Sequence, residues 1–160
     1  VTPIIAVDTK PNRLALAQEL GATHVINGAE EDAVAAVKRI THERGADFSL
    51  ECTGVPKVLR QAVESLGIRG TCGIVGAAPL GAEVPIDIND VMVPGKTITG
   101  IIEGDSVPDV FIPRLVDLYA AGRFPFDRLV KFYTLDTINE AAEDSEQGGT
   151  LKPIVRMQAA

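Results

Sequence analysis

Short runs of apolar residues alternate with segments in which apolar positions recur every three or four residues through the first half of the chain. The runs have the length of buried strands, and the segments between them have the spacing of amphipathic helices. We therefore predict strands at 3–8, 24–26, 47–52 and 71–75 and helices at 11–20, 30–43 and 56–66. This alternation, with short glycine-containing connections, favours right-handed crossovers and a parallel sheet of the α/β class.

Residues that start and stop helices support the first two helical segments. Pro11 stands where a helix begins and Gly21 just past its end, which is the usual asymmetry of these two residues. The segment 30–43 opens on three acidic residues. Because negative charge is favourable in a first helical turn, we expect residues 30–32 to form that turn.

The pattern changes after Gly76, where glycines and prolines become frequent. Pro108 can occupy the first turn of a helix, but Pro113 is expected to kink or break it, since proline lacks an N–H and its ring clashes with the preceding turn. We predict an edge strand at 84–86, strands at 97–102, 130–133 and 152–157, and helices at 106–121 and 137–146.

The composition is that of a globular domain and limits the partners. The 160 residues are 46% hydrophobic and 23% charged. The formal net charge of −7 argues against nucleic acid and anionic membranes, because both attract basic surfaces. No apolar run reaches the roughly 18 residues of a membrane-spanning helix, and no signal-peptide pattern opens the chain.

The cysteines and histidines show no metal-ligand spacing. Cys52 and Cys72 lie in or beside predicted strands, so we expect both to be small buried hydrophobic residues. We place the chain in the cytoplasm, where a disulfide between them is not expected. His24 and His42 are isolated, and we expect structural or surface roles for both.

Asp8 ends the first predicted strand. A carboxylate there can accept hydrogen bonds from both hydroxyls of an adenosine ribose and repel a 2′-phosphate, which would select NAD over NADP. Arg13, in the next predicted helix, could reach the same ribose. Taken alone, Asp8 is equally well an ordinary polar residue at a strand end, and Arg13 fits a solvated helix face better.

Two later strands also end in small residues. The stretch ECTGV, 51–55, places Gly54 before a proline that opens a helix, and GIVGAA, 73–78, places Gly76 after the next strand. Glycine lets a ligand approach the backbone closely. Because ligands of open α/β sheets bind outside the carboxyl ends of the strands, Asp8 and these two turns are expected to line one crevice.

Other candidate motifs carry less weight. GTCGIVG, 70–76, looks like a phosphate-binding loop, but its apolar strand lies inside the motif and no helix opens at its second glycine. Glu103 follows the strand 97–102 at the same sheet edge, and it is equally well a loop carboxylate without a role. We find no catalytic constellation and no metal-binding motif in the sequence.

Four stretches together resemble the zinc-type medium-chain alcohol dehydrogenases: VDTKPNRLALAQELGATHVIN, GADFSLECTGVPKVL, GTCGIVG and GTLKPIVRM. The segment 103–133 is similar to the aryl-alcohol, or benzyl-alcohol, branch of that family. The resemblance implies NAD as the cofactor. The positions that it assigns are Asp8 and Arg13 at the adenosine ribose; Thr53, Gly54 and Val55 near the ribose and pyrophosphate; Val75, Gly76, Ala77, Ile101 and Glu103 around the nicotinamide; and Lys152 at the pyrophosphate.

The same resemblance implies a Rossmann-type, doubly wound parallel sheet that lacks its first strand and its glycine-rich turn. That strand is central in the order 3-2-1-4-5-6, so strands 3–8 and 47–52 have no shared neighbour. The family's zinc ligands and proton-relay groups would lie in an absent N-terminal part, and we expect the chain to be a piece of a longer polypeptide. Residues 1–124 would form the NAD-binding domain, and residues 125–160 would return to the catalytic domain.

Our leading hypothesis is the NAD-binding portion of a zinc-dependent alcohol dehydrogenase. It would transfer hydride between NAD and a small alcohol or aldehyde, with aromatic alcohols as candidates. We assign no catalytic residue and no metal ligand within the chain, so the piece alone is expected to be inactive. The family also implies a homo-oligomer formed through the edge segment 83–102. Two alternatives stay open: a related polyol, threonine or formaldehyde dehydrogenase, and a non-catalytic module that reports NAD or NADH to a partner.

Overall fold

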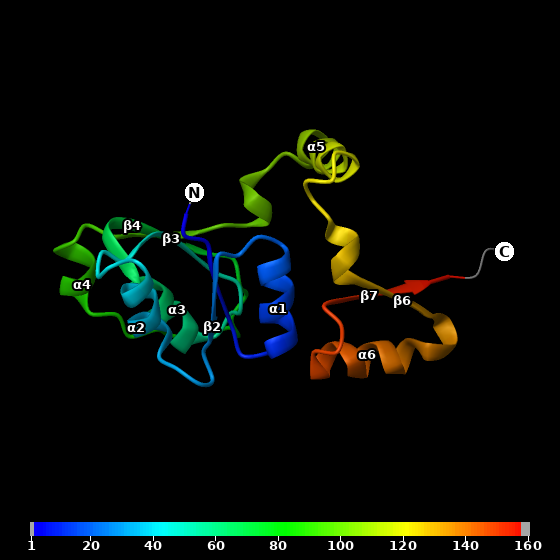
Figure 1. The fold of residues 1–160 in the computed structure, drawn as a ribbon, viewed down its shortest axis with the longest axis horizontal. Coiled ribbons are helices and arrows are strands. Elements are labelled where there is room, and N and C mark those ends of the chain that lie inside the picture. The colour runs from blue at the N-terminus through cyan, green and yellow to red at the C-terminus, as the bar shows by residue number, and fades with distance from the viewer. Residues whose placement is uncertain (1, 158–160) are drawn as a thin grey trace. The chain divides into compact units, whose positions relative to one another are not determined.

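The computed structural model describes residues 2–157 and divides into two compact units, one ending at Asp105 and one beginning at Ser106. The alternation of strands and helices in the first unit confirms the α/β class (Figure 1). Its elements are β1 (Ile5–Asp8), α1 (Pro11–Glu19), β2 (His24–Asn27), α2 (Ala33–Ile40), β3 (Ala46–Glu51), α3 (Pro56–Glu64), β4 (Leu66–Ile74), α4 (Ile88–Met92), β5 (Thr97–Gly100) and a 3-10 turn (Glu103–Asp105).

The strands of this unit form two separate parallel sheets. β1 pairs with β2, and β3, β4 and β5 pair in that order. Among the described residues, no backbone ladder joins β1 to β3. A doubly wound sheet without its central strand would divide at this place.

α2 packs against both sheets through one hydrophobic cluster. Ile5 of β1 and Ala46 of β3 both pack against it, so the two sheets share a core. The buried members of the cluster are Ile26, Ala33, Ala36 and Val37. A second cluster, formed by Val63, Leu66 and Cys72, lies between α3 and β4.

The strands beside the division keep apolar side chains exposed. Phe48 and Leu50 of β3 are 74% and 66% exposed, and Val7 of β1 is 48% exposed. Strands of parallel sheets are ordinarily covered on both faces. The division of the sheet therefore leaves an apolar surface open.

α2 is shorter than the predicted helix 30–43. Asp32 is its N-cap, and its Oδ1 accepts the N–H of Ala35 at 2.8 Å. The carboxylate satisfies an N–H that has no partner within the helix and so fixes the start. Residues 30–31 therefore precede the helix, and the expectation that they form its first turn is wrong. Residues 42–43 have positive φ angles and lie beyond its carboxyl end.

For the later part of the chain, the predicted strand 84–86 is wrong, and of the two effects expected of Pro113 the break is wrong. No strand forms at 84–86; Pro85 has no N–H to donate to a ladder, which disfavours pairing there. Pro113 does not break its helix, because α5 (Pro108–Ala120) continues through it. The cost is one backbone hydrogen bond, the one that an N–H at this position would donate to the Asp109 carbonyl.

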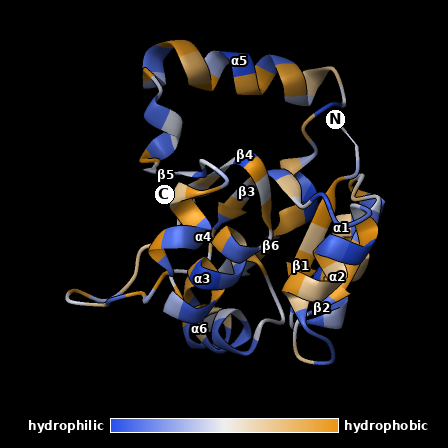
Figure 2. Cartoon of the chain, turned by 90° about the vertical axis from the view of Figure 1, so that its left-hand side faces the viewer, coloured by the Kyte–Doolittle hydropathy of each residue, from blue (hydrophilic) through white to orange (hydrophobic). Residues whose placement is uncertain are grey.

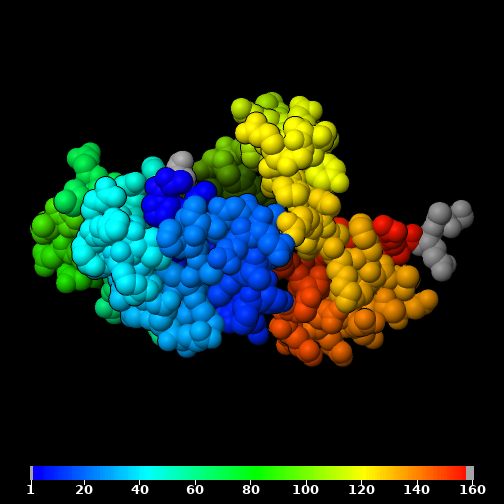
Figure 3. Space-filling view, in the orientation of Figure 1, coloured from blue at the N-terminus to red at the C-terminus, as the bar shows by residue number. Residues whose placement is uncertain are grey.

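The second unit consists of α5 followed by a small parallel pair of strands and a helix. Asp144 of its last helix accepts hydrogen bonds from Lys131 Nζ and Tyr133 Oη, each at 2.6 Å. Lys131 and Tyr133 hold the pKa of this carboxyl below its usual range. The further elements are a 3-10 turn (Phe126–Leu129), β6 (Val130–Thr134), a 3-10 turn (Leu135–Thr137), α6 (Ile138–Gln147) and β7 (Lys152–Arg156). In Figure 3 the orange α6 packs directly against the red β7.

α5 mixes hydrophobic and hydrophilic residues along its length (Figure 2). Val110, Ile112 and Val116 are each more than half exposed. Within residues 2–157, however, every helix is too short or too polar to cross a membrane.

Candidate functional site

A buried carboxylate lies at the carboxyl end of β3. Glu51 is 2% exposed, and its Oε1 accepts the N–H of Thr53 at 2.6 Å and the N–H of Gly54 at 3.1 Å. The hydroxyl of Thr53 donates to the same oxygen, and that hydroxyl in turn accepts the N–H of Val55 at 3.1 Å. Glu51 therefore organises the whole turn between β3 and α3.

The turn after β4 is held to the same residue through the backbone. The carbonyl of Glu51 accepts the N–H of Val75 at 2.8 Å and the N–H of Gly76 at 2.9 Å. A Cβ added to Gly76 would lie 2.2 Å from the nitrogen of Gly54, and a Cβ added to Gly54 would lie 2.2 Å from the carbonyl oxygen of Ala77. The contact between the two turns therefore requires glycine at both positions, in addition to the close ligand approach expected from the sequence.

Asp8 ends β1 and uses one oxygen to close its own turn. Its Oδ1 accepts the N–H groups of Thr9 and Lys10 at 2.7 and 2.9 Å. Its Oδ2 lies 3.8 Å from an Nη of Arg13, and about a third of each side chain is exposed. Among the described residues, Arg13 Nε is buried without a hydrogen-bond partner. The exposed parts of the Asp8 carboxylate and of the Arg13 guanidinium therefore lie side by side where a ligand could reach them.

The remaining predicted site residues of the first unit also lie at or just beyond strand ends. Ile101 follows β5 and is half-buried. Glu103 is exposed and has a φ of 51°, in the left-handed region that few glutamates adopt. Those exposed on the turns after β3 and β4 are Thr53, Val55, Val75 and Ala77. Ten of the eleven predicted residues thus lie in one unit, at the carboxyl ends of β1, β3, β4 and β5 or, for Arg13, in the helix that follows.

Lys152 is the exception, because it lies in the second unit. It begins β7, opposite Val130 of β6, and its side chain is exposed. Its predicted contact with a pyrophosphate stays a prediction, as do the binding roles of the other ten residues.

The two cysteines differ from one another. Cys72 is fully buried, as predicted, but Cys52 is exposed. Successive residues of a strand point to opposite faces, and Glu51 takes the buried side at this strand end. Partial burial and the neighbouring Glu51 raise the pKa of the Cys52 thiol.

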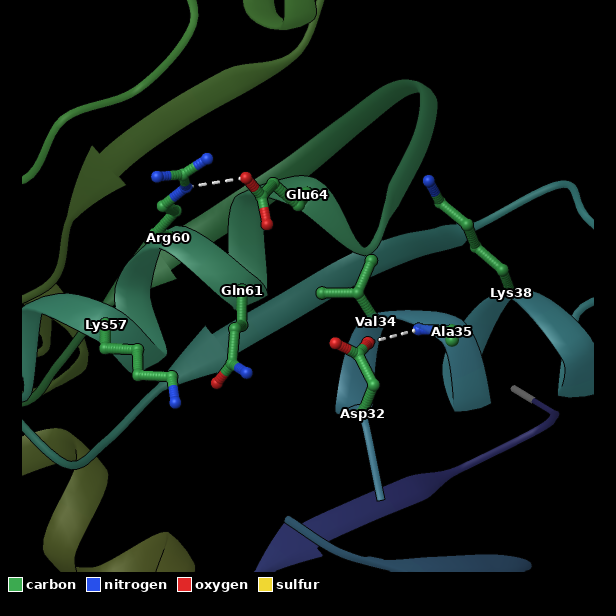
Figure 4. Close-up of a pocket in the computed structure, with 8 residues that line it drawn as sticks. All are labelled: Asp32, Val34, Ala35, Lys38, Lys57, Arg60, Gln61 and Glu64. Atoms are coloured by element: carbon green, nitrogen blue, oxygen red, sulfur yellow. Dashed lines mark hydrogen bonds and ion pairs between the residues drawn. The ribbon is translucent and has the colours of Figure 1, made fainter. Parts of the chain in front are cut away.

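A cavity of about 570 Å³ lies elsewhere, between α2 and α3 (Figure 4). Three of its charged groups are already engaged: Arg60 pairs with Glu64 at 2.7 Å, and Asp32 caps α2. The lining residues are Asp32, Val34, Ala35, Lys38, Lys57, Arg60, Gln61 and Glu64. None of them belongs to the predicted site, so this cavity and the strand ends are different places.

Glu51 is the residue of the site that sequence reasoning missed. It stands in the quoted stretch ECTGV, but its charge gives no reason to expect burial. The available signal was a carboxylate directly before a Thr-Gly turn, whose N–H groups need an acceptor.

The described residues contain no group of three or more His, Cys, Asp or Glu side chains placed to hold a metal ion. Residues 2–157 by themselves therefore do not fit a zinc site.

Comparison with known proteins places this geometry in a family. Residues 2–121 match the family described as "Zinc-binding dehydrogenase". The crystal structure of benzyl alcohol dehydrogenase from Acinetobacter calcoaceticus superimposes with a TM-score of 0.95 at 53% identity, over 99% of this chain and 43% of that one. The geraniol dehydrogenase of Castellaniella defragrans is 42% identical over 95% of this chain and 41% of its own length.

A more distant structure carries a cofactor. A zinc-binding dehydrogenase from Sinorhizobium meliloti, bound to NADP, matches with a TM-score of 0.81 at 25% identity, over 97% of this chain and 45% of that one. The chain spans about two fifths of the length of the curated relatives that it matches.

Proposed function

The chain belongs to the zinc-binding dehydrogenase family, and from this premise we propose that it is the NAD-binding portion of an alcohol dehydrogenase. The whole enzyme would move hydride between an alcohol, with aromatic alcohols as candidates, and the nicotinamide of NAD. The observation that carries the proposal is the placement of Asp8, with about a third of its side chain exposed, at the carboxyl end of a parallel strand.

Asp8 and Arg13 supply the proposed ribose contacts. Asp8 Oδ2 would accept from a ribose hydroxyl, and the exposed part of the Arg13 guanidinium would donate to a hydroxyl oxygen beside it. A 2′-phosphate would instead bring two further negative charges towards Asp8, which supports NAD as the cofactor over NADP.

The turns after β3, β4 and β5 would hold the rest of the dinucleotide. Thr53, Gly54 and Val55 would lie along the ribose and pyrophosphate, and Val75, Gly76, Ala77, Ile101 and Glu103 around the nicotinamide. The exposed apolar surfaces of Val55 and Val75 suit a flat ring. Lys152 would place its charge on the pyrophosphate. Bound NAD would supply the hydride acceptor, and the chain would supply position and selectivity.

The zinc of the proposed enzyme would be held outside this chain, because residues 2–157 bring no ligand cluster together. A cytoplasmic location and self-association through the segment 83–102 are further parts of the proposal. Ile88, Met92 and Val93 in that segment are exposed, between 64% and 77%, which supports an interface there.

Titration of the longest natural polypeptide that contains this chain with NADH, followed by cofactor fluorescence, tests the proposal. We expect saturable binding, and oxidation of benzyl alcohol or geraniol, the alcohols named for two relatives. Binding without turnover of any alcohol, polyol, threonine or formaldehyde adduct would favour the non-catalytic module. Absence of dinucleotide binding would overturn the proposal.

The 160-residue chain alone is expected to show no alcohol oxidation. Its described residues form no metal site, and no residue is assigned as acid or base. The chain therefore has no assigned group to polarise the alcohol or to take its proton. The measurement is NADH formation by the purified chain with zinc and a panel of alcohols. Turnover above that of a Gly76→Ala variant, which serves as the control for contaminating activity, would contradict this prediction.

Cys52 is expected to report on dinucleotide binding. Its raised pKa predicts slow alkylation at neutral pH. The rate should increase only at a pH above about 8.5, the usual pKa of a free thiol. NADH at saturation should slow that reaction several-fold, because Cys52 lies between Glu51 and the proposed contact Thr53. Peptide mass spectrometry follows it, with buried Cys72 as the internal control. Equal rates with and without NADH would place the dinucleotide away from this turn.

A further inference from the structure

Resting on the proposed dinucleotide site, we propose that Glu51 is a positioning residue, whose buried carboxylate sets the turn 53–55 in the geometry that binds the dinucleotide. Glu51 itself is too buried to be a ligand-contacting residue. Its action would pass through the hydroxyl of Thr53 and the N–H groups of the turn.

The burial of Glu51 is unusual because no cation within residues 2–157 pairs with it. Its side-chain partners are neutral donors, the hydroxyl of Thr53 and the N–H groups of Thr53 and Gly54. None of the ion pairs among the described residues includes it. A buried carboxylate is costly unless its hydrogen bonds are well made, so its energy depends strongly on the geometry of this turn.

A chain of hydrogen bonds leads from the buried carboxylate to the exposed surface. The Thr53 hydroxyl donates to Glu51 and accepts the N–H of Val55, so its orientation is fixed from both sides. Thr53 and Val55 are the exposed members of the turn. Hydrogen bonds that involve a charged partner are roughly twice as strong as neutral ones, which makes this order dependent on the charge of Glu51.

The side chain and the backbone of Glu51 hold different turns, so the two roles can be tested separately. The carboxylate holds residues 53–55, whereas the carbonyl holds Val75 and Gly76. Glu51→Gln keeps the carbonyl and the shape but removes the charge. It also replaces Oε2, which now accepts the N–H of Gly54 at 3.2 Å, with an NH₂ group. That group is a donor and would face another donor.

The experiment uses Glu51→Gln in the longest natural polypeptide that contains this chain. We expect the dissociation constant of NADH to rise by on the order of 10-fold and kcat at saturating cofactor to stay within about twofold. Amide hydrogen exchange without cofactor should become faster at Thr53 and Gly54 and change less at Val75 and Gly76. Val63→Ala, which truncates a buried core side chain near the carboxyl end of α3, is the control for lost stability.

Thr53 supplies a second test should Glu51→Gln fold poorly. Thr53→Val removes the hydroxyl and should weaken NADH binding, whereas Thr53→Ser keeps it and should restore binding to near wild type. The double variant Glu51→Gln/Thr53→Val should lose less binding free energy for NADH than the sum of the losses in the two single variants, because both substitutions break the same chain of hydrogen bonds.

Three outcomes would overturn the positioning role: unchanged NADH affinity in Glu51→Gln, a loss of affinity no larger than that of Val63→Ala, or additive losses in the double variant. Failure of the wild-type protein to bind NADH would instead overturn the proposed function, and the exchange of Thr53 and Gly54 would still show whether Glu51 orders the turn.

Discussion

Replacing Asp8 by alanine is expected to weaken NAD binding by on the order of 10- to 100-fold while leaving NADP binding unchanged or improved. The change removes the oxygen that would accept from the ribose hydroxyls. It also removes the negative charge that would repel a 2′-phosphate, and it releases Arg13, whose Nη now lies 3.8 Å from Asp8 Oδ2, to meet that phosphate. Titrations with NADH and NADPH in parallel measure the ratio of the two affinities.

Asp8→Asn is the matched control for this prediction. Its amide oxygen can still accept the N–H groups of Thr9 and Lys10, so the turn after β1 is retained. The charge alone is lost, and the preference for NAD should fall by less than in Asp8→Ala. An equal weakening of NADH and NADPH by either variant would show that Asp8 supports the fold and does not select the dinucleotide.

The strand-and-helix order could be predicted from the sequence because each element carries its own signal. β1 and β3 are short runs bounded by helix-starting residues, and Pro11 and Pro56 each stand at the first turn of a helix. The division between β1 and β3 also followed, because the family resemblance identified which strand was missing. Helix ends were less accurate: whether a carboxylate such as Asp32 caps a helix or lies inside it depends on the backbone conformation of that one residue, which is extended here with a ψ of 114°.

The site was predicted only in part because its order comes from contacts between turns distant in sequence. Hydrophobic pattern predicted a buried Cys52 and gave no reason to expect burial of the charged Glu51, whereas the structure buries Glu51 and exposes Cys52. The reversal depends on three donors, in Thr53 and Gly54, that converge on one carboxylate. A pattern of single residues along the chain does not contain that convergence.

Gly76→Ala is expected to destabilise the fold by about 3 kcal/mol or more and to abolish measurable dinucleotide binding. Its Cβ would lie 2.2 Å from the nitrogen of Gly54 and 2.7 Å from the nitrogen of Thr53, and both neighbours are backbone that side-chain rotation cannot move. The two turns would have to separate, which also pulls the Gly76 N–H from the Glu51 carbonyl. Denaturant unfolding and NADH titration of the longest natural polypeptide that contains the chain measure the two effects.

Other glycines separate the clash from the strain of a positive φ. Gly54→Ala combines both, since Gly54 has a φ of 70° and its Cβ would meet the Ala77 carbonyl. Gly81→Ala has the strain alone, with a φ of 80° and no atom within 4 Å, and should cost about 1–2 kcal/mol. Gly28→Ala has neither, because its nearest contact is an ordinary 3.7 Å to Val7, and should be close to neutral.

The order of these four variants decides whether the close contact of the two turns is real. If the turns touch, the loss of stability should be smallest in Gly28→Ala and should increase through Gly81→Ala and Gly76→Ala to Gly54→Ala. Only Gly76→Ala and Gly54→Ala should lose dinucleotide binding. A Gly76→Ala protein as stable as Gly28→Ala would mean that the turn after β4 lies away from the turn after β3. The carbonyl of Glu51 would then not hold Val75 and Gly76, and the strand ends would not form one site.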